Sequence, residues 1–356
     1  GEPAADTFGV DQFHHEMSKR VATQPAGLSA TSTHDTKRGE DGRARLYALS
    51  EAPDAWKDAV TRWQKMNAAH VAQLADGPAP EPRVEWMLYQ ALAGVWPADA
   101  GVGAAPPADL SERFLAYVEK ALREAKQRTN WGDENGAYEE AVKAYAENLL
   151  ASDNAAFLQD FRKTVQPFIR AGLFNGLTQT LIKLVGPGIP DIYQGAEQLD
   201  VSLVDPDNRR MPDYVKLAAD LSATTSVKDE AALAGGIVKQ QLVAEVLALR
   251  QAEPTLFVEG DYQPVAITGE RAGNAVAFLR RHGDKILIAI APRLVFGLAE
   301  GEWPCGDYWG DTAIVLPDLG DGMLRNVIGG DVLEANGTMM LAKILQNAPV
   351  ALLFKQ

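Results

Sequence analysis

The sequence predicts an α+β fold in which a long, mainly helical part precedes a small β domain. Apolar residues recur at helical spacing over most of the chain up to about residue 252. From Pro254 onward the pattern changes to short β-type runs separated by Gly, Pro and Asp. Two short strand-like runs interrupt the helical part, one leading into the polar stretch at His34 and one at Ile189–Tyr193.

Composition limits the classes of protein to which this chain can belong. Its 356 residues and 46% hydrophobic content are enough for roughly two or three domains with packed cores. The formal charge is −14 and Lys/Arg runs are sparse, so we expect no nucleic acid and no membrane as partner. The single cysteine, Cys305, excludes an intrachain disulfide and a Cys-based zinc site. Without a spanning apolar run or a signal pattern we expect a cytoplasmic protein, and Gly1-Glu2-Pro3 is typical of an internal start.

Helical spacing and end signals predict the helices. Pro25 stops the first, Ser50 followed by Pro53 starts the third, and Pro167 is expected to break the longest one. The expected helices are Val10–Val21, Glu40–Leu49, Pro53–Ala72, Arg83–Val95, Asp109–Arg128, Glu134–Leu150, Asp153–Leu184, Pro212–Ala223 and Ile237–Gln251. Residues 53–165 are thus predicted to be all-helical, and they hold most of the tryptophans. Core packing is their ordinary role, but Trp86, Trp96 or Trp131 could instead stack on a sugar.

The β domain is expected over residues 253–356 as a small antiparallel structure. Its expected strands are Ala275–Leu279, Lys285–Ile290, Ala313–Leu316 and Val350–Phe354, with a short helix at Ala342–Gln346.

A dense group of ionisable residues, His34-Asp35-Thr36-Lys37-Arg38, follows the first strand-like run. Loops after parallel strands converge on one face of an α/β structure, and active-site groups collect there. The alternative is a structural role in which Asp35 caps the next helix.

A second polar segment follows the other strand-like run. Leu203–Arg210 combines carboxylates, an amide and two guanidiniums, as either a solvated turn with local ion pairs or a polar clamp for a hydroxyl-rich ligand. The chain has no P-loop, no dinucleotide glycine fingerprint, no His-x-x-x-His pair and no Asp/Asn loop with calcium spacing. We therefore expect no metal and no cofactor.

Three ordered motifs carry a family resemblance. They are Ala30-Thr-Ser-Thr-His-Asp-Thr-Lys-Arg-Gly-Glu-Asp41, Gly188-Ile-Pro-Asp-Ile-Tyr-Gln-Gly195 and Ser202-Leu-Val-Asp-Pro-Asp-Asn-Arg-Arg210, with weaker echoes at 88–97, 120–131 and 349–353. Together they span essentially the whole chain, which resembles the maltooligosyltrehalose synthases of the α-amylase family (glycoside hydrolase family 13).

The resemblance implies a partial (β/α)8 barrel. Residues 1–52 would carry the loop after strand seven, 53–165 a helical insert, 166–252 strand eight with its following helices, and 253–356 the C-terminal β domain. Gly39 and Gly42 depart from the family pattern, where we expect bulkier residues.

The resemblance also implies roles for individual residues. Asp35 matches the family's third catalytic carboxylate and His34 the histidine that binds the same glucose. A carboxylate on sugar hydroxyls gains strength as the ring flattens towards an oxocarbenium ion. The other substrate-binding residues would be Lys37, Arg38, Tyr193, Gln194, Glu197, Asp205, Asp207, Asn208 and Arg209.

The implied reaction converts the reducing-end α-1,4 bond of a maltooligosaccharide into an α,α-1,1 bond by intramolecular transglycosylation. Because retaining chemistry needs two further carboxylates, which the family takes from earlier strands, we expect a C-terminal fragment that is inactive alone. Its expected partners are the missing N-terminal half of the barrel or a second copy bound through the open barrel surface. Two alternatives remain: another α-glucan-active enzyme, such as a glucanotransferase or amylase, or a non-catalytic glucan-binding module.

Overall fold

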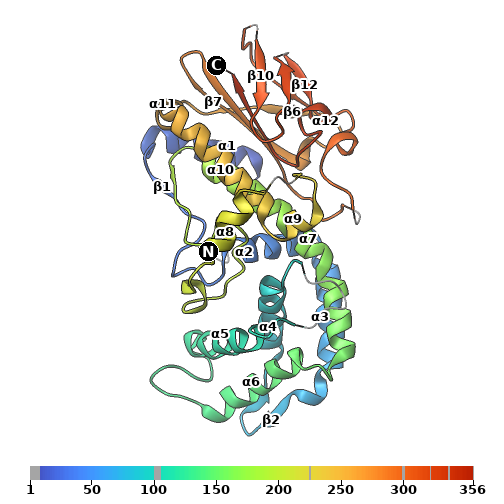
Figure 1. Ribbon diagram of the computed structural model, residues 1–356. Helices are drawn as coiled ribbons and strands as arrows, with labels where there is room; N and C mark the ends of the chain where they lie inside the picture. Colours follow the sequence, from blue (N-terminus) through green and yellow to red (C-terminus); the bar gives the residue numbers. More distant parts are fainter. Residues whose placement is uncertain are drawn as a thin grey trace. The chain divides into compact units, whose positions relative to one another are not determined.

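The computed structural model describes residues 9–99, 106–223, 226–298, 301–320, 322–335 and 337–355 (Figure 1). The chain divides into two compact units. Unit 1 comprises Gly1–Thr31, Phe174–Leu199 and Pro212–Gln356, and unit 2 comprises Ser32–Leu173 and Asp200–Met211. The division falls inside the long helix α7 (Ala155–Val185).

Unit 1 contains the two strand-like runs as a parallel pair. Strand β1 (Leu28–Ser29) pairs in parallel with β4 (Ile189–Pro190), which is shorter than the strand expected at this position. The Arg20 side chain, on helix α1 (Val10–Thr23), donates to the carbonyls of Gly27 and Leu28 at 3.0 and 2.9 Å and so fixes the start of β1. Leu28 is 74% exposed and Ile189 is 43% exposed, so this pair presents apolar side chains to solvent.

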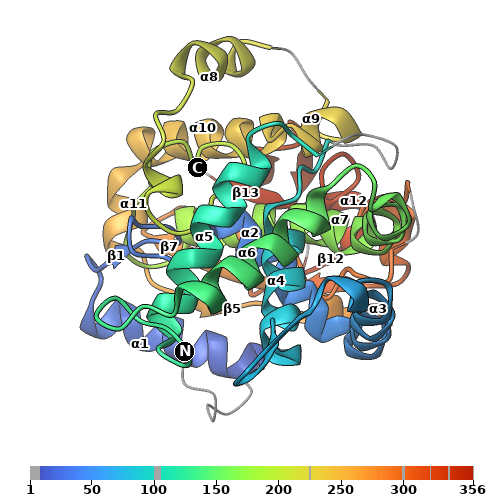
Figure 2. The same cartoon turned by 90° about the horizontal axis from the view of Figure 1, so that it is seen from below.

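Further helices of unit 1 follow β4 along the chain. They are α8 (Tyr214–Leu221), α9 (Glu230–Ala234), α10 (Ile237–Ala252) and α11 (Pro254–Glu259), of which α9 and α11 were not anticipated. None of the residues of α8 is buried, and Figure 2 shows this helix at the periphery, beyond α10. No helix within the described ranges has the length and apolar character needed to cross a bilayer.

The β domain of unit 1 is antiparallel, as expected, and is built from two sheets. The larger has the strand order β11-β10-β13-β8-β7-β5 and the smaller β12-β9-β6. The strands are β5 (Gln263–Pro264), β6 (Ala266–Thr268), β7 (Ala275–His282), β8 (Lys285–Pro292), β9 (Ala313–Val315), β10 (Met323–Asn326), β11 (Val332–Glu334), β12 (Thr338–Met340) and β13 (Ala351–Lys355), with α12 (Leu341–Ile344) between the last two.

The central strands β7, β8 and β13 are buried on both faces, so they appear in the sequence as continuous apolar runs rather than alternating ones. One face, with Leu279, Ile288 and Leu353, packs in the core between the sheets. On β7, the buried Arg280 donates to the carbonyls of Val185 and Gly260 at 3.1 and 2.7 Å. These bonds tie the sheet to the end of α7 and satisfy a charge that would otherwise be costly to bury.

Unit 2 is a helical structure around a cluster of aromatic side chains. Its helices are α2 (Glu40–Tyr47), α3 (Pro53–Met66), α4 (Pro82–Val95), α5 (Leu110–Ala125), α6 (Gly136–Leu150) and the first part of α7. Trp56 and Trp63 of α3 meet edge to face with 5.4 Å between ring centroids, and Trp63 lies 5.1 Å from Phe161 of α7. These contacts are the ordinary core role of tryptophan.

Two expectations for the helical region are wrong. The hairpin β2 (Ala72–Leu74) with β3 (Gly77–Ala79) lies within the stretch predicted to be all-helical. Ala75 and Asp76 form its two-residue turn, and Gly77 begins β3 at a φ of +124°. Helix α7 continues through Pro167 instead of breaking. The missing hydrogen bond costs the helix roughly 3 kcal/mol, but Val165 and Phe168 on either side are buried and hold both halves in line.

Candidate functional site

The loop that carries the His34–Asp35 motif is joined to the segment Asp200–Met211, and both belong to unit 2. The N–H of Gly39 donates to the carbonyl of Ser202 at 2.8 Å, and the N–H of Asp41 donates to the carbonyl of Asp200 at 3.0 Å. The Asp200 carboxylate accepts the hydroxyl of Ser32 at 2.7 Å. Two segments far apart in the sequence therefore form one framework.

Gly39 is required for this close approach. A Cβ at this position would lie closer to the backbone oxygen and carboxylate of Asp200 than side-chain carbons normally come to any atom. Gly42 is less constrained, because its Cβ would lie 3.2 Å from the carbonyl of Gly94. The bulkier residue that we expected at position 39 therefore has no room in this framework.

The side chains of His34 and Asp35 project from this framework into solvent. Their side chains approach to 3.2 Å between Nε2 and Oδ2, and the Asp35 side chain is 86% exposed. Below them the backbone forms a tight turn, in which the Thr36 hydroxyl donates to the carbonyl of Thr33 at 2.8 Å and the Asp35 N–H donates to the Thr33 hydroxyl at 3.2 Å. The Asp35 carboxylate is therefore accessible and has little protein contact of its own.

Asn208 supports the turn from beneath. Its buried amide nitrogen donates to the carbonyls of His34, Thr33 and Thr36 at 2.9, 3.3 and 3.5 Å. The amide oxygen Oδ1 is buried and has no hydrogen-bond partner among the described residues. This geometry makes Asn208 a residue that positions the backbone below His34 and Asp35.

Asn208 belongs to a short 3-10 helix, Asp207–Arg209, and the Asp207 side chain holds the start of this helix in place. Arg113 on α5 donates to both of its carboxylate oxygens, at 2.8 and 3.1 Å, and the N–H of Leu203 donates to Oδ2 at 2.7 Å. Burial alone would raise the pKa of Asp207, but these hydrogen bonds outweigh it and hold the pKa below its usual value. Asp207 is thus a buried, charged structural anchor.

Helix α5 contributes a polar face to the site. Tyr117 accepts a hydrogen bond from Arg38 at 3.0 Å, Lys120 donates to the carbonyl of Asp205 at 2.9 Å, and Glu124 pairs with Lys37 at 2.8 Å. Asp205 also forms an ion pair with Arg209, whose side chain is about half exposed. The arrangement combines both charge signs with hydroxyl and amide groups, which suits a neutral polar ligand better than a strongly charged one.

The expected site residues therefore fall into two sets. Unit 2 brings together His34, Asp35, Lys37, Arg38, Asp205, Asp207, Asn208 and Arg209. Tyr193, Gln194 and Glu197 lie in unit 1, directly after β4. Among these three, Gln194 is exposed and Glu197 has one buried carboxylate oxygen without a hydrogen-bond partner in the described part of the chain.

Sequence reasoning missed the residues on which this framework depends. Asp200, Arg113 and Tyr117 were not singled out, and Ser32, Lys120 and Glu124 lie in the quoted motifs without an assigned role. A signal was present, because the four of these residues that belong to α5 recur at spacings of four, three and four residues and so lie on one face of the helix. Of the tryptophan candidates, Trp96 belongs to the core, whereas Trp131 is 57% exposed and lies under the guanidinium of Arg123, 4.8 Å from its ring centroid.

The search for protein-family models found none that matches this chain. A Mycobacterium tuberculosis protein, provisionally named a maltooligosyl trehalose synthase, is 34% identical over 355 residues, which is 100% of this chain and 41% of that protein. The maltooligosyltrehalose synthase structure from Arthrobacter ramosus superposes with a TM-score of 0.81 at 33% identity, over 100% of this chain and 42% of its own. A hypothetical maltooligosyl trehalose synthase from Sulfolobus tokodaii gives a TM-score of 0.74 at 27% identity, over 98% of this chain and 41% of its own.

These similarities confirm the resemblance carried by the three motifs. The chain spans about two fifths of the length of the relatives it matches, 41% for the Mycobacterium tuberculosis protein and 42% for the Arthrobacter ramosus structure. In sequence and in fold, from end to end, this chain is a homologue of one portion of the maltooligosyltrehalose synthases.

Proposed function

We propose that this chain is the C-terminal portion of an enzyme that isomerises the reducing-end α-1,4 bond of a maltooligosaccharide to an α,α-1,1 bond. The whole-length match to maltooligosyltrehalose synthases is the observation that supports this proposal most strongly. An accessible carboxylate, Asp35, on a framework rich in polar groups agrees with it. The cytoplasm is the proposed setting for this reaction.

The proposed chemistry is a retaining double displacement. A carboxylate nucleophile attacks the anomeric carbon, and the leaving glucose takes a proton from a general acid. The anomeric hydroxyl of that glucose then attacks the covalent intermediate, gives its proton back to the same group and releases the nucleophile. Bonds and protons balance, so the net change is an isomerisation, and water must be kept out to prevent hydrolysis.

In this scheme Asp35 and His34 hold the glucose next to the cleaved bond. The Asp35 carboxylate accepts hydrogen bonds from sugar hydroxyls, and these bonds strengthen as positive charge develops on the ring. Lys37, Arg38 and Arg209 supply donors, Asp205 an acceptor, and Asp207 and Asn208 hold the framework. The family resemblance assigns substrate binding also to Tyr193, Gln194 and Glu197, which follow β4 in unit 1.

The proposed partner is the remaining part of the barrel, which would supply the nucleophile and the general acid. The exposed apolar side chains of Leu28 and Ile189 on the β1–β4 pair support a covered surface at this point. A second copy of the chain could cover it instead, which sedimentation would detect as a dimer. A clean monomer would exclude that arrangement.

The test is a complementation assay on maltopentaose. The chain is incubated with substrate alone and together with the separately expressed remaining portion of the enzyme, and the products are separated by HPLC. We expect a trehalose-ended oligosaccharide only when both parts are present. Asp35→Asn in the complemented enzyme should reduce turnover by at least about 100-fold, because an interaction made in the transition state is lost.

Other outcomes identify the alternatives. Shorter maltooligosaccharides or redistributed chain lengths would indicate an amylase or a glucanotransferase. Binding without any conversion in the complemented sample would indicate a glucan-binding module. Conversion by the chain alone would show that both further carboxylates lie within these 356 residues.

A further inference from the structure

Trp131 lies in the loop between α5 and α6 of unit 2, and its side chain is 57% exposed. Among the described residues of these two helices and the loop that joins them, it is the only large hydrophobic side chain that is exposed. A single exposed apolar side chain is common on protein surfaces, so exposure alone indicates no function. The contacts that hold this ring in place are what distinguish it.

A guanidinium covers one face of the Trp131 ring. The Arg123 side chain, on the last turn of α5, lies over the ring at 4.8 Å from its centroid. Arg123 is itself fixed, because it donates to both carboxylate oxygens of the buried Glu139 at 3.0 and 2.8 Å. Since more than half of the Trp131 side chain remains accessible, the opposite face of the indole is open to solvent.

Hydrogen bonds within the loop fix the backbone on both sides of the ring. The Asn130 side-chain oxygen accepts the N–H groups of Gly132 and Asp133 at 2.9 and 3.0 Å. The Thr129 hydroxyl donates to the carboxylate of Glu139. The indole is therefore held in one orientation before any ligand binds, and binding does not have to order it first.

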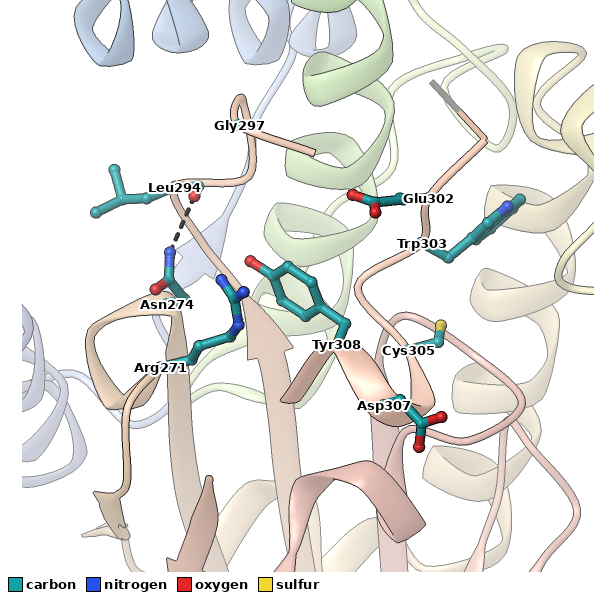
Figure 3. Close-up of a pocket in the computed structure, with 9 residues that line it drawn as sticks. All are labelled: Arg271, Asn274, Leu294, Gly297, Glu302, Trp303, Cys305, Asp307 and Tyr308. Carbon is teal, nitrogen blue, oxygen red and sulfur yellow. Dashed lines mark hydrogen bonds between the residues drawn. The ribbon is translucent and has the colours of Figure 1, made fainter. Parts of the chain in front are cut away.

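The other guanidinium–aromatic pairs of the described residues use the ring for packing. Figure 3 shows one such pair in the β domain, where Arg271 lies 4.3 Å from the centroid of the Tyr308 ring and that ring packs against the hydrophobic core. The rings of four further pairs are buried, namely those of Trp96, Tyr117, Tyr138 and Phe257. Trp131 differs from all of these, because its ring is held by a cation and faces solvent.

Helix α5 connects the Trp131 ring with the candidate site. Glu124 follows Arg123 at the end of this helix and pairs with Lys37 at 2.8 Å. Of these two consecutive residues, one contacts the ring and the other contacts the loop that carries His34 and Asp35. All of them belong to unit 2. The ring therefore lies at the margin of the candidate site, on the side of Lys37.

The surroundings of the ring suit a sugar. The Glu134 carboxylate lies 3.2 Å from Nη1 of Arg123, and its side chain is 54% exposed, so it can accept hydrogen bonds from hydroxyl groups beside the ring. A sugar presents the matching combination of C–H groups on its faces and hydroxyl groups at its rim. A protein partner would require a broader apolar patch, but α5, α6 and their loop expose no second large hydrophobic side chain among the described residues.

We propose that the open face of Trp131 is a platform on which a glucose unit of the substrate stacks, remote from the reacting bond. The choice of an α-1,4-glucan rests on the proposed function, whereas the sugar class rests on the ring and its surroundings. In the proposed reaction only one glucose lies on the reducing-end side of the bond, so the stacked unit belongs to the non-reducing part of the chain. The platform thus favours maltooligosaccharides that are long enough to reach it.

The first test is calorimetric titration of the 356-residue chain with maltoheptaose. Trp131→Ala removes the platform, and the variant should fold with an unchanged melting temperature because the ring is largely exposed. We expect the affinity to fall about tenfold, since the stacking surface is lost. Trp131→Phe keeps an aromatic face and should retain most of the affinity.

Tyr47→Ala is the matched control. Tyr47 is an aromatic residue of unit 2 with a similar exposed fraction, 55%, at the end of α2. Its replacement should leave the affinity for maltoheptaose unchanged. Equal losses in Tyr47→Ala and Trp131→Ala would show that sugars contact exposed rings without preference and would overturn the proposal.

The second test measures chain-length selectivity in the complemented enzyme. The ratio of kcat/KM for maltoheptaose to kcat/KM for maltotriose should fall about tenfold in Trp131→Ala, through a higher KM for the longer substrate. A structural role of the ring would instead lower kcat/KM for both substrates by the same factor and leave this ratio unchanged.

Two results of the titration would overturn the platform: equal affinity of the Trp131→Ala chain and its parent, or no heat of binding with maltoheptaose at millimolar concentration. Weaker binding of the Trp131→Ala chain to the remaining portion of the enzyme, with unchanged affinity for maltoheptaose, would assign the ring to a protein contact and overturn it as well. Failure of complementation, with binding of maltoheptaose that depends on Trp131, would count against the proposed function alone.

Discussion

At the scale of single residues, the candidate site consists of exposed side chains and of buried side chains that hold the backbone beneath them. Asp35 is accessible and makes few contacts, whereas Asn208 is buried and spends its donors on the backbone of the turn that carries His34 and Asp35. The motif predicted that both segments matter together. The sequence could not show which polar residue faces solvent and which faces a carbonyl, because that depends on contacts between residues 174 positions apart.

Asn208→Ala should therefore lower the stability of the chain and, through the displaced turn, the turnover of the complemented enzyme. The lost hydrogen bonds leave buried carbonyls unsatisfied, at a cost of about 1–3 kcal/mol in the free energy of unfolding. Asn208→Asp should be worse than Asn208→Ala, because it turns a carboxylate towards three carbonyl oxygens. Urea unfolding of both variants measures this order. Unchanged stability in both would indicate that Asn208 contributes nothing to the framework.

At the scale of elements, the framework depends on how closely segments approach and on what the helices bury. Helix α5 was predicted from its periodicity, but its pairing with Lys37, Arg38 and Asp205 was not. At position 39 we expected a residue bulkier than glycine, and only the structure shows that Asp200 leaves no room for a side chain there.

Gly39→Ala tests the close approach. The added Cβ collides with Asp200, and displacing backbone at a packed contact costs about 1–3 kcal/mol in the free energy of unfolding. We expect a lower melting temperature and reduced turnover in the complemented enzyme. Gly136→Ala is the control, since a Cβ at this helical position meets nothing within 4 Å and should leave the melting temperature unchanged or raise it. Equal melting temperatures for the two variants would contradict this account.

Unit 2 also contains a buried carboxyl group, that of Glu85, whose pKa is shifted in the direction opposite to that of Asp207. Burial raises the pKa of Glu85 on α4, although its carboxylate accepts the Tyr145 hydroxyl at 2.7 Å. Between its usual pKa and the raised value, the folded state holds a proton that the unfolded state has lost. This contribution to stability is therefore present at low pH and is lost as pH rises through the folded-state pKa.

Glu85→Gln removes this pH dependence. Relative to the parent, the variant should gain stability between pH 4.5 and pH 7.5, with 4.5 the ordinary pKa of glutamate. The control is Glu139→Gln, because hydrogen bonds from Arg123 lower the pKa of Glu139 and the sign reverses. Urea unfolding at the two pH values gives both differences. A difference for Glu85→Gln that does not vary with pH would refute the assignment.

At the scale of the whole molecule, the β1–β4 pair is the feature that favours association with another polypeptide. A sheet of two parallel strands leaves unpaired backbone groups at its edges, and here the side chains exposed beside them are apolar. Such edges readily associate with another strand. The relatives are more than twice as long as this chain, which covers 41% of the Mycobacterium tuberculosis protein.

Leu28→Asp should separate folding from association. The side chain is 74% exposed, so the melting temperature of the isolated chain should change little. Binding to the remaining portion of the enzyme should weaken at least tenfold if that portion covers β1, as a pull-down titration would measure. Val332→Asp, at an exposed position on the edge strand β11, is the matched control and should bind normally. Equal binding of both variants would place the contact elsewhere.

The sequence by itself determined most helices, the antiparallel β domain and the three motifs that carry the family resemblance. These are local or periodic signals, since apolar spacing reports which side of an element is buried. The tertiary structure decided that α7 runs through Pro167, that residues 72–79 form a hairpin, and that β7, β8 and β13 are covered on both faces. It also decided which polar residues support Asp35. Such outcomes depend on contacts between distant segments, whose energies outweigh local preference and leave no periodic trace in the chain.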